Sequence, residues 1–233
     1  MGDLRVIPAR DRFHHESDWL STYWLFSFDH YYDPRNVSFG PLRVFNDDTV
    51  QPGKGFPPHS HADMEIVSYV ISGALEHQDS RGNRGVIRAG EVQVMSAGSG
   101  ITHAEYNPSP SEPVHFLQIW IRPRRRGLEP RWDQRTFEAS EGAGRLLPVV
   151  SGDARAPLRI DGDATIFVAA LRDGETVRHE TAAGHRTFWY VVEGDVVLDD
   201  TALSTGDQAR VEDLSSFELK ATATAELVLI DLP

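Results

Sequence analysis

The sequence predicts an all-β protein in which one β-barrel is used twice along the chain. Short apolar runs separated by turn residues fill positions 39–121, where helical periodicity is nearly absent, and such runs resume from residue 158. Several short strands at regular spacing are typical of a β-sandwich or barrel. Two segments also recur in the same order: residues 69–73 (YVISG) resemble residues 190–194 (YVVEG), and residues 90–94 (GEVQV) resemble residues 206–210 (GDQAR). Self-similarity of this kind indicates a repeated structural unit.

Each expected strand is an apolar run bounded by turn residues. In the first half these runs lie at residues 4–7, 42–45, 66–71, 86–87, 92–95 and 114–121, and the aromatic-rich residues 19–28 suit a strand or a buried irregular segment. Residues 46–48 (NDD) and 98–100 (GSG) are interpreted as turns, because Asn, Asp and Gly favour turn conformations. In the second half the runs lie at residues 165–171, 187–192, 196–198, 208–211, 217–219 and 227–232.

The repeat predicts two domains. Residues 122–158 are rich in Pro, Arg and Gly and are interpreted as a connector with short structured pieces. We therefore expect an N-terminal domain with a lead-in segment over residues 1–135 and a C-terminal domain over residues 136–233.

Composition narrows the possible functions. The chain has no cysteine, so thiolate ligands and thiol catalysis are excluded. Its formal net charge of -12 argues against direct nucleic-acid binding, and the basic residues 122–126 are interrupted by Pro123. No apolar run is long enough to cross a bilayer, and the first residues lack the apolar core of a secretory signal. We therefore expect a cytoplasmic protein that does not contact the membrane.

Two pairs of side chains predict a metal site in the first half of the chain. His59 and His61 are two residues apart, as are His103 and Glu105. Because side chains on a strand alternate between its faces, each pair shares one face. If the two faces meet, three imidazoles and a carboxylate converge, a ligand set that suits a divalent first-row transition metal with open positions. Loop histidines with local hydrogen bonds are the alternative, but two such pairs favour the metal.

The carboxylate ligand is open on spacing alone. Glu65 lies four residues after His61, so on a regular strand it too would face inward, and either Glu65 or Glu105 fits. The other histidines of this half, His77 and His115, are interpreted as packing or hydrogen-bonding residues. In the second half, His179 and His185 are six residues apart and could share a strand face, but they have no second pair to complete a site.

The glycines and histidines of two segments resemble the two cupin motifs. Residues 53–65 contain Gly53, His59, His61 and Glu65 as in the first motif, and residues 90–107 resemble the second, with Ser96 in place of its proline and extra residues between Gly98 and His103. Residues 39–44 (FGPLRV), 75–83 (LEHQDSRGN) and 95–105 (MSAGSGITHAE) are similar to the bacterial pirin family. The resemblance is strong over residues 18–135 and only architectural beyond them.

This resemblance implies a bicupin, with two jelly-roll-like β-barrels in tandem and a metal only in the N-terminal one. It implies His59, His61, His103 and Glu105 as ligands, which selects Glu105 over Glu65. The expected ion is Fe²⁺, with Mn, Co, Ni, Cu and Zn as alternatives. Bacterial pirins are associated with quercetin 2,3-dioxygenase activity, and the eukaryotic relative is described as a nuclear coregulator.

Two functions follow as hypotheses. The first is a metal-dependent dioxygenase that opens the ring of a flavonol such as quercetin, or of a similar enol-bearing aromatic, with O₂ as co-substrate and Glu105 as the catalytic base. The alternative is a non-enzymatic metal- or redox-responsive regulatory protein that binds a protein partner. A roomy apolar pocket above the metal would favour the enzyme. We expect a monomer in either case.

Overall fold

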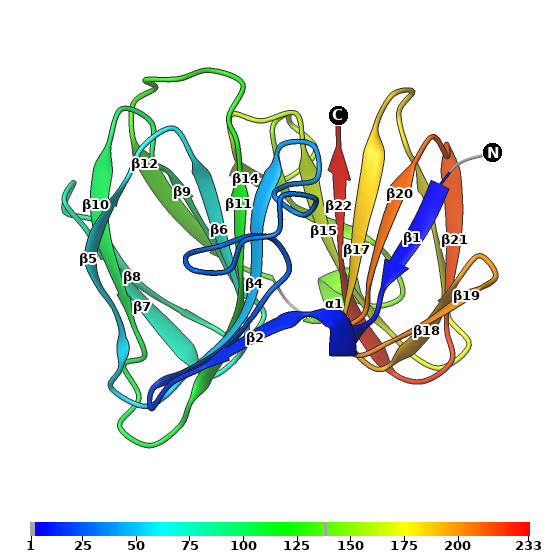
Figure 1. Cartoon of the computed structure of the whole chain (residues 1–233), viewed down its shortest axis with the longest axis horizontal. Helices are drawn as coiled ribbons and strands as arrows, with labels where there is room; N and C mark the ends of the chain where they lie inside the picture. The colour runs from blue at the N-terminus through cyan, green and yellow to red at the C-terminus, as the bar shows by residue number, and fades with distance from the viewer. Residues whose placement is uncertain (1–2, 138) are drawn as a thin grey trace. The chain divides into compact units, whose positions relative to one another are not determined.

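The computed structural model of the chain describes residues 3–137 and 139–233 and consists almost entirely of antiparallel strands (Figure 1). The chain forms two compact units. The N-terminal unit comprises residues 13–137 and 158–162, and the described residues of the C-terminal unit are 3–12, 139–157 and 163–233. The expected boundary after residue 135 lies close to the end of the longer N-terminal stretch. Two short segments are exchanged between the units. Residues 3–12 belong to the C-terminal unit, although they precede the N-terminal one in sequence, and residues 158–162 belong to the N-terminal unit.

The N-terminal unit consists of a large sheet and a small sheet that face each other (Figure 1). The large sheet has the strand order β12-β9-β6-β11-β4-β3-β2, and the small one has the order β5-β10-β7-β8. The strands of this unit are β2 (Phe13–Glu16), β3 (Leu20–Trp24), β4 (Leu42–Val50), β5 (Gly55–His61), β6 (Glu65–Ser72), β7 (Ala74–Asp79), β8 (Arg84–Arg88), β9 (Glu91–Ser96), β10 (Ile101–Tyr106), β11 (Val114–Ile121), β12 (Arg131–Thr136) and the short β14 (Leu158–Arg159).

The C-terminal unit repeats this topology. Its large sheet contains the order β1-β20-β17-β22-β15-β13, and its small sheet has the order β16-β21-β18-β19. Its elements are β1 (Asp3–Ile7), the 3-10 helix η1 (Ala9–Asp11), α1 (Ala139–Gly142), β13 (Leu147–Ser151), β15 (Thr165–Leu171), β16 (Thr176–Glu180), β17 (Arg186–Glu193), β18 (Asp195–Leu198), β19 (Thr201–Ser204), β20 (Gln208–Glu212), β21 (Ser216–Ala221) and β22 (Ala225–Leu232). Tyr69 on β6 and Tyr190 on β17 occupy equivalent positions, so the repeat predicted from sequence is confirmed.

The interiors of the two units differ in one row of residues that crosses the large sheet. In the N-terminal unit this row is polar, and register pairs Asn46 with Gln118, Gln118 with Ser68, and Ser68 with Gln93. On either side of it lie two separate apolar clusters, one that contains Phe116 and one that contains Ile66 and Met95. We call Asn46, Gln118, Ser68 and Gln93 the polar row.

The equivalent row of the C-terminal unit is apolar. Register pairs Phe167 with Leu229, Leu229 with Trp189, and Trp189 with Ala209. Leu229, Trp189 and Ala209 all belong to one continuous buried cluster, with Phe167 packed against it. The same topology therefore folds with an apolar row, so the fold itself does not require the polar one.

Two predictions from the sequence were wrong here. Residues 46–48 are not a turn: β4 runs through them from Leu42 to Val50, because β3 and β11 pair with it on both sides. Residues 131–136 are not part of a connector, since β12 pairs with β9 along its whole length and forms an edge of the large sheet. The turn at residues 98–100 is confirmed by the positive φ of Gly98 and Gly100.

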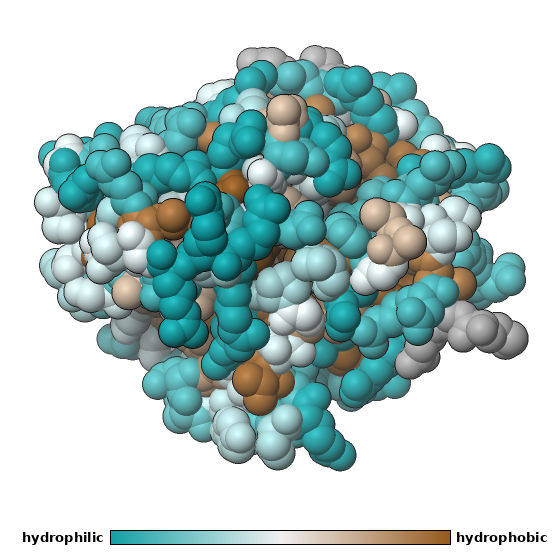
Figure 2. Space-filling view, turned by 90° about the horizontal axis from the view of Figure 1, so that it is seen from above, coloured by the Kyte–Doolittle hydropathy of each residue, from teal (hydrophilic) through white to brown (hydrophobic). Residues whose placement is uncertain are grey.

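Polar side chains predominate on the face of the molecule seen in Figure 2, where apolar residues form small, separate patches. Among the side chains that the structure describes, Tyr32 is the one large apolar side chain that is mostly exposed. Within residues 3–137 and 139–233, no helix combines the length and the apolar character needed to cross a bilayer.

Candidate metal centre

The candidate metal centre lies where β5 and β10 pair in the small sheet of the N-terminal unit. His59 and His103 are direct cross-strand partners. Just beyond them the register shifts, so that Glu105 pairs with Phe56 and β5 carries one extra residue. The bulge falls at Pro57 and Pro58, which have no N–H to donate to a strand ladder. Bulges of this kind redirect side chains and are frequent beside functional sites.

Three of the predicted ligands converge. One ring nitrogen from each of His59, His61 and His103 lies within 4.8 Å of the other two. The Nε2 atoms of His61 and His103 are buried and have no hydrogen-bond partner among the residues that the structure describes. A buried polar atom without a partner is costly, so two of them aimed at one point indicate a place for a cation.

Electrostatics keep two of these rings neutral. Burial, together with His103 and His59, lowers the pKa of His61 to about 4. Burial, together with His59 and His77, lowers the pKa of His103 to about 3. Both rings are therefore uncharged near neutral pH, and a neutral imidazole offers the lone pair that a metal ion binds.

Hydrogen bonds to the other ring nitrogens select the required tautomers. His59 Nδ1 lies 2.8 Å from the carbonyl oxygen of Pro57, so it carries the proton and leaves Nε2 free. His77 Nε2 lies 3.2 Å from the carboxylate of Asp79, and His77 Nδ1 lies 3.4 Å from His103 Nδ1. Although burial alone would raise it, hydrogen bonds from Asn83 and His77 lower the pKa of Asp79.

An ionised Asp79 can only accept, so His77 donates through Nε2 and its Nδ1 becomes an acceptor. His103 then donates from Nδ1 and presents its Nε2 lone pair to the cluster. The three residues Asp79, His77 and His103 form a chain that we call the histidine relay. His77 is fully buried and stacks on Trp132, which agrees with the packing and hydrogen-bonding role expected from the sequence.

Glu105 is held by three residues of the polar row, Gln93, Ser68 and Gln118. Its Oε1 accepts hydrogen bonds from Gln93 at 2.7 Å and from Ser68 at 3.2 Å, and its Oε2 accepts one from Gln118 at 2.8 Å. A carboxylate has about four acceptor positions, so one position on Oε2 is left. A carboxylate oxygen of Glu105 lies within 4.8 Å of ring nitrogens of His103 and His77, which form a second candidate ligand group.

Glu65 does not join either group. Asp63 has a positive φ of 50°, which breaks the extended backbone between β5 and β6 and resets the alternation of side chains. Glu65 accepts a hydrogen bond from Ser96 Oγ at 2.5 Å, whereas its neighbour Ile66 lines the cavity beside the histidines. The alternation of side chains counted from His61 therefore ends at Asp63, and it does not predict where Glu65 points.

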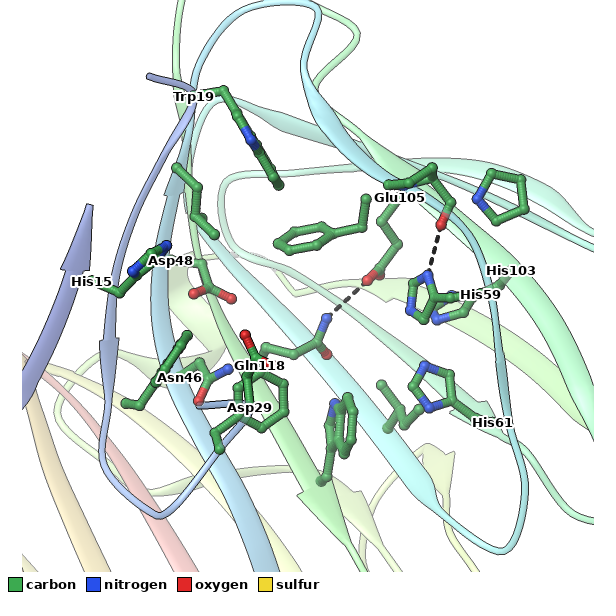
Figure 3. A pocket seen from close by; sticks show the side chains of 18 residues that line it. His15, Trp19, Asp29, Asn46, Asp48, His59, His61, His103, Glu105 and Gln118 are labelled. Carbon is green, nitrogen blue, oxygen red and sulfur yellow. Dashed lines mark hydrogen bonds between the residues drawn. The ribbon is translucent and has the colours of Figure 1, made fainter. Parts of the chain in front are cut away.

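A cavity of about 610 Å³ opens beside the histidines, within the N-terminal unit. Figure 3 shows His59, His61 and His103 at one end and Asn46, Asp48 and Asp29 at the other, with Gln118 between them. Most of the remaining wall is apolar and consists of Trp19, Leu20, Trp24, Phe28, Phe56, Pro57, Pro58, Ile66 and Trp120.

Several polar residues in and around this cavity were missed in the sequence. Ser68, Gln93 and Gln118 are single polar residues inside apolar strands, a signal that was available but has no characteristic spacing. Asn46 and Asp48 were assigned to a turn. Burial, the largest cause, acts together with the neighbouring carboxylates of Asp47 and Glu105 to raise the pKa of Asp48 to about 7, although Thr22 and His115 partly offset it.

The C-terminal unit keeps a histidine at only one of these cluster positions, since Phe217 and Leu219 stand where His103 and Glu105 do. His179 pairs with Phe217 as His59 pairs with His103, and Leu219 stands where Glu105 does. His179 and His185 do not share a strand face, since a turn with Gly184 at φ +80° separates them. They instead contact the two oxygens of Asp231, at 2.7 and 2.6 Å.

Two units of paired antiparallel sheets, with histidines gathered at a cavity in one of them, define a cupin-type protein with two domains. The family model described as Pirin matches residues 6–121, and that described as Quercetinase C-terminal cupin domain matches residues 148–232. The chain is 43% identical over 226 residues to a quercetin 2,3-dioxygenase of Escherichia coli, with 97% of this chain and 96% of the relative covered. The chain belongs to the pirin family.

Other relatives agree. A pirin-like protein of Caulobacter vibrioides is 43% identical over 215 residues, with 91% of this chain and 92% of the relative covered. The crystal structure of the bacterial pirin YhhW from Escherichia coli in complex with nickel(II) has a TM-score of 0.94 and 41% sequence identity, and 99% of each chain is covered. The expected fold class, an all-β bicupin, is confirmed by these likenesses.

Proposed function

We propose that this chain is a metal-dependent dioxygenase that opens the ring of a flavonol, or of a similar enol-bearing aromatic, with O₂ as co-substrate. The cavity is the observation that supports the enzyme over a metal-responsive regulator. It has the volume of a small-molecule site, which is about 300–1,000 Å³, and its wall is mostly apolar with a few polar groups. The names of the relatives, quercetin 2,3-dioxygenase, point to the same chemistry.

We assign His59, His61, His103 and Glu105 as the residues that hold the metal. The partnerless Nε2 atoms of His61 and His103, the neutral state of those rings and the tautomer of His59 all fit a divalent first-row ion. We expect the ion to be Fe²⁺, and a related structure binds nickel(II). Loading the protein with each ion separately would identify the one that supports activity. When bound, the ion would supply a positive charge that stabilises an enolate oxygen.

The residues of this chain would then bind, orient and deprotonate the substrate. The aromatic wall formed by Trp19, Phe56 and Trp120 holds a flat ring and excludes water from it. Glu105 takes the proton of the enolic hydroxyl at Oε2, the oxygen with an acceptor position to spare. Because only one position is left, Glu105 cannot bind the metal and the proton at once through Oε2. Its two proposed roles must alternate.

We further propose that the metal is confined to the N-terminal unit. In the equivalent places of the C-terminal unit, Phe217 and Leu219 offer no donor atom, and Trp189 fills the position of Ser68. This unit would support the fold rather than the chemistry.

Oxygen uptake is the direct test. Protein loaded separately with Fe²⁺, Mn²⁺, Co²⁺, Ni²⁺ or Cu²⁺ is given quercetin, with a His103→Ala variant as control. Metal-dependent uptake that the variant abolishes would support dioxygenase chemistry at this site. Absence of uptake with every ion, in protein shown to contain the metal, would reject it.

A further inference from the structure

The end of the cavity opposite the histidines carries a second group of polar side chains. Asn46 and Asp48 project from β4 into the cavity, on the far side of Gln118 from the histidines (Figure 3). They are 4% and 3% exposed. Strand interiors are unusual places for Asn and Asp, which are depleted in strands. Neither residue is part of the proposed metal site.

Asn46 has an unused acceptor. Its Oδ1 atom is buried and has no hydrogen-bond partner within the described part of the chain. Leaving such an atom unpaired costs about 1–3 kcal/mol. Because the side chain lines the cavity, a bound molecule with an O–H or N–H donor could satisfy it.

The C-terminal unit shows that the fold does not need these polar groups. By strand register, Phe167 occupies the position of Asn46, and Ala169 occupies that of Asp48. Both are accommodated in an interior of the same topology. Burying Asn46 and Asp48 therefore lowers the stability of the N-terminal unit, and their presence there has a reason other than folding.

We propose that Asn46 and Asp48 form a second polar subsite, which binds a hydroxyl group on the part of the substrate that lies away from the metal. This inference rests on the proposed function and deepens it. It narrows the substrate class to aromatic molecules with two polar ends: an enolic hydroxyl beside a carbonyl at the histidines, and a hydroxyl that reaches Asn46. The apolar wall between the two ends matches the ring system that joins them.

The chemistry of the two side chains suits a hydroxyl. The ligand O–H donates to Asn46 Oδ1, and its oxygen can accept from Asp48, since burial raises the pKa of that carboxyl to about 7 and keeps much of it protonated. A hydroxyl both donates and accepts, whereas a ligand carboxylate could only accept and would leave Asn46 Oδ1 unpaired.

A comparison of two ligands tests the subsite. Quercetin is compared with 3-hydroxyflavone, which keeps the enolic hydroxyl and the carbonyl but lacks the other hydroxyls. Dissociation constants are measured on full-length protein loaded with Ni²⁺, without oxygen, so that binding is read independently of turnover. One net hydrogen bond is worth about 1 kcal/mol, so the wild type should bind quercetin about 5- to 10-fold more tightly.

Two variants locate the preference. Asn46→Leu and Asp48→Ala make both positions apolar, as they are in the C-terminal unit, and should each bring the ratio of the two dissociation constants close to one. Their affinity for 3-hydroxyflavone should be unchanged, which shows that the cavity is intact. Asp133→Asn, which changes an exposed carboxyl on β12 outside the cavity wall, is the control and should keep the wild-type ratio.

The outcomes separate this inference from the proposed function. Equal binding of the two flavonols by the wild type, or a wild-type ratio in both Asn46→Leu and Asp48→Ala, would overturn the subsite and leave a flavonol-binding metal site in place. If the wild type binds neither flavonol, both the subsite and the flavonol proposal are overturned.

Discussion

His77 Nδ1 lies 3.4 Å from His103 Nδ1, and this contact links one proposed metal ligand to a buried carboxylate. The direction of the relay is fixed at its far end, because Asp79 is ionised and can only accept. His77 would therefore act on a metal bound at the proposed site through His103, by holding that ring in the tautomer whose Nε2 is free. Partners of this kind are known to orient metal ligands and to raise their basicity.

Breaking the relay should weaken metal binding. His77→Phe preserves the stacking on Trp132 but removes the acceptor for His103 Nδ1. Loss of such a supporting group typically weakens metal affinity by about 10- to 100-fold. Calorimetric titration of the metal-free protein with Ni²⁺ measures this directly.

His115→Phe is the matched control for that experiment. His115 also contacts an aspartate, at 2.5 Å from Asp47, but it belongs to neither of the two candidate ligand groups. Its loss should leave the affinity for Ni²⁺ within about twofold of the wild type. Equal affinities of the wild type and His77→Phe would show that the relay does not position His103.

Glu105→Gln should separate the two proposed roles of Glu105. The amide keeps one oxygen, so it can accept from either Gln93 or Gln118 but not from both, and it cannot take a proton at neutral pH. General base catalysis contributes about 100- to 10,000-fold, so oxygen uptake with quercetin should fall by that factor. Metal content is measured on the same samples. Full activity in metal-loaded Glu105→Gln would exclude Glu105 as the base.

The histidine cluster was predictable because strands impose a period of two. His59 with His61, and His103 with Glu105, lie on β5 and β10 as that period required. The same rule failed for Glu65, where the positive φ of Asp63 interrupts the strand. Spacing predicts facing side chains only while the backbone stays extended, and a single residue in the left-handed region is enough to end the pattern.

The far end of the cavity was not predictable from local signals. Asn46 and Asp48 belong to residue types that favour turns, and only the pairing of β4 with β3 and β11 keeps them extended. That pairing joins segments distant in sequence, so no window around residue 46 contains it. The supporting residues Gln93 and Gln118 are likewise recognisable only once the strands of the large sheet are aligned.

Asp48 should make the stability of the protein fall as the pH rises. In the unfolded chain an aspartate titrates near 3.9, whereas burial raises the pKa of Asp48 to about 7 in the fold. Between these values the folded state keeps a proton that the unfolded state releases. The contribution of Asp48 is therefore fully present below about pH 4 and is lost by about pH 7, with an upper bound on the order of 4 kcal/mol.

Urea unfolding of metal-free protein at pH 5 and pH 8 tests this linkage. Asp48→Asn cannot ionise, so its free energy of unfolding should rise relative to that of the wild type between the two pH values. Asp29→Asn, which removes an exposed carboxyl, serves as the control. A constant difference between wild type and Asp48→Asn would mean that Asp48 titrates as an ordinary aspartate.

Equivalent positions of the two units should respond to substitution in opposite ways. Trp189 is 1% exposed and lies at the centre of the C-terminal core, so Trp189→Ala should lower the free energy of unfolding by about 3–5 kcal/mol.

Ser68, the counterpart of Trp189 in the N-terminal unit, donates to Glu105 Oε1, and Ser68→Ala removes only that hydroxyl. It should cost about 1–2 kcal/mol of stability and yet reduce oxygen uptake with quercetin. Trp189→Ala should keep its uptake at temperatures where it remains folded. If Ser68→Ala left turnover unchanged, the polar row would not hold Glu105 for catalysis.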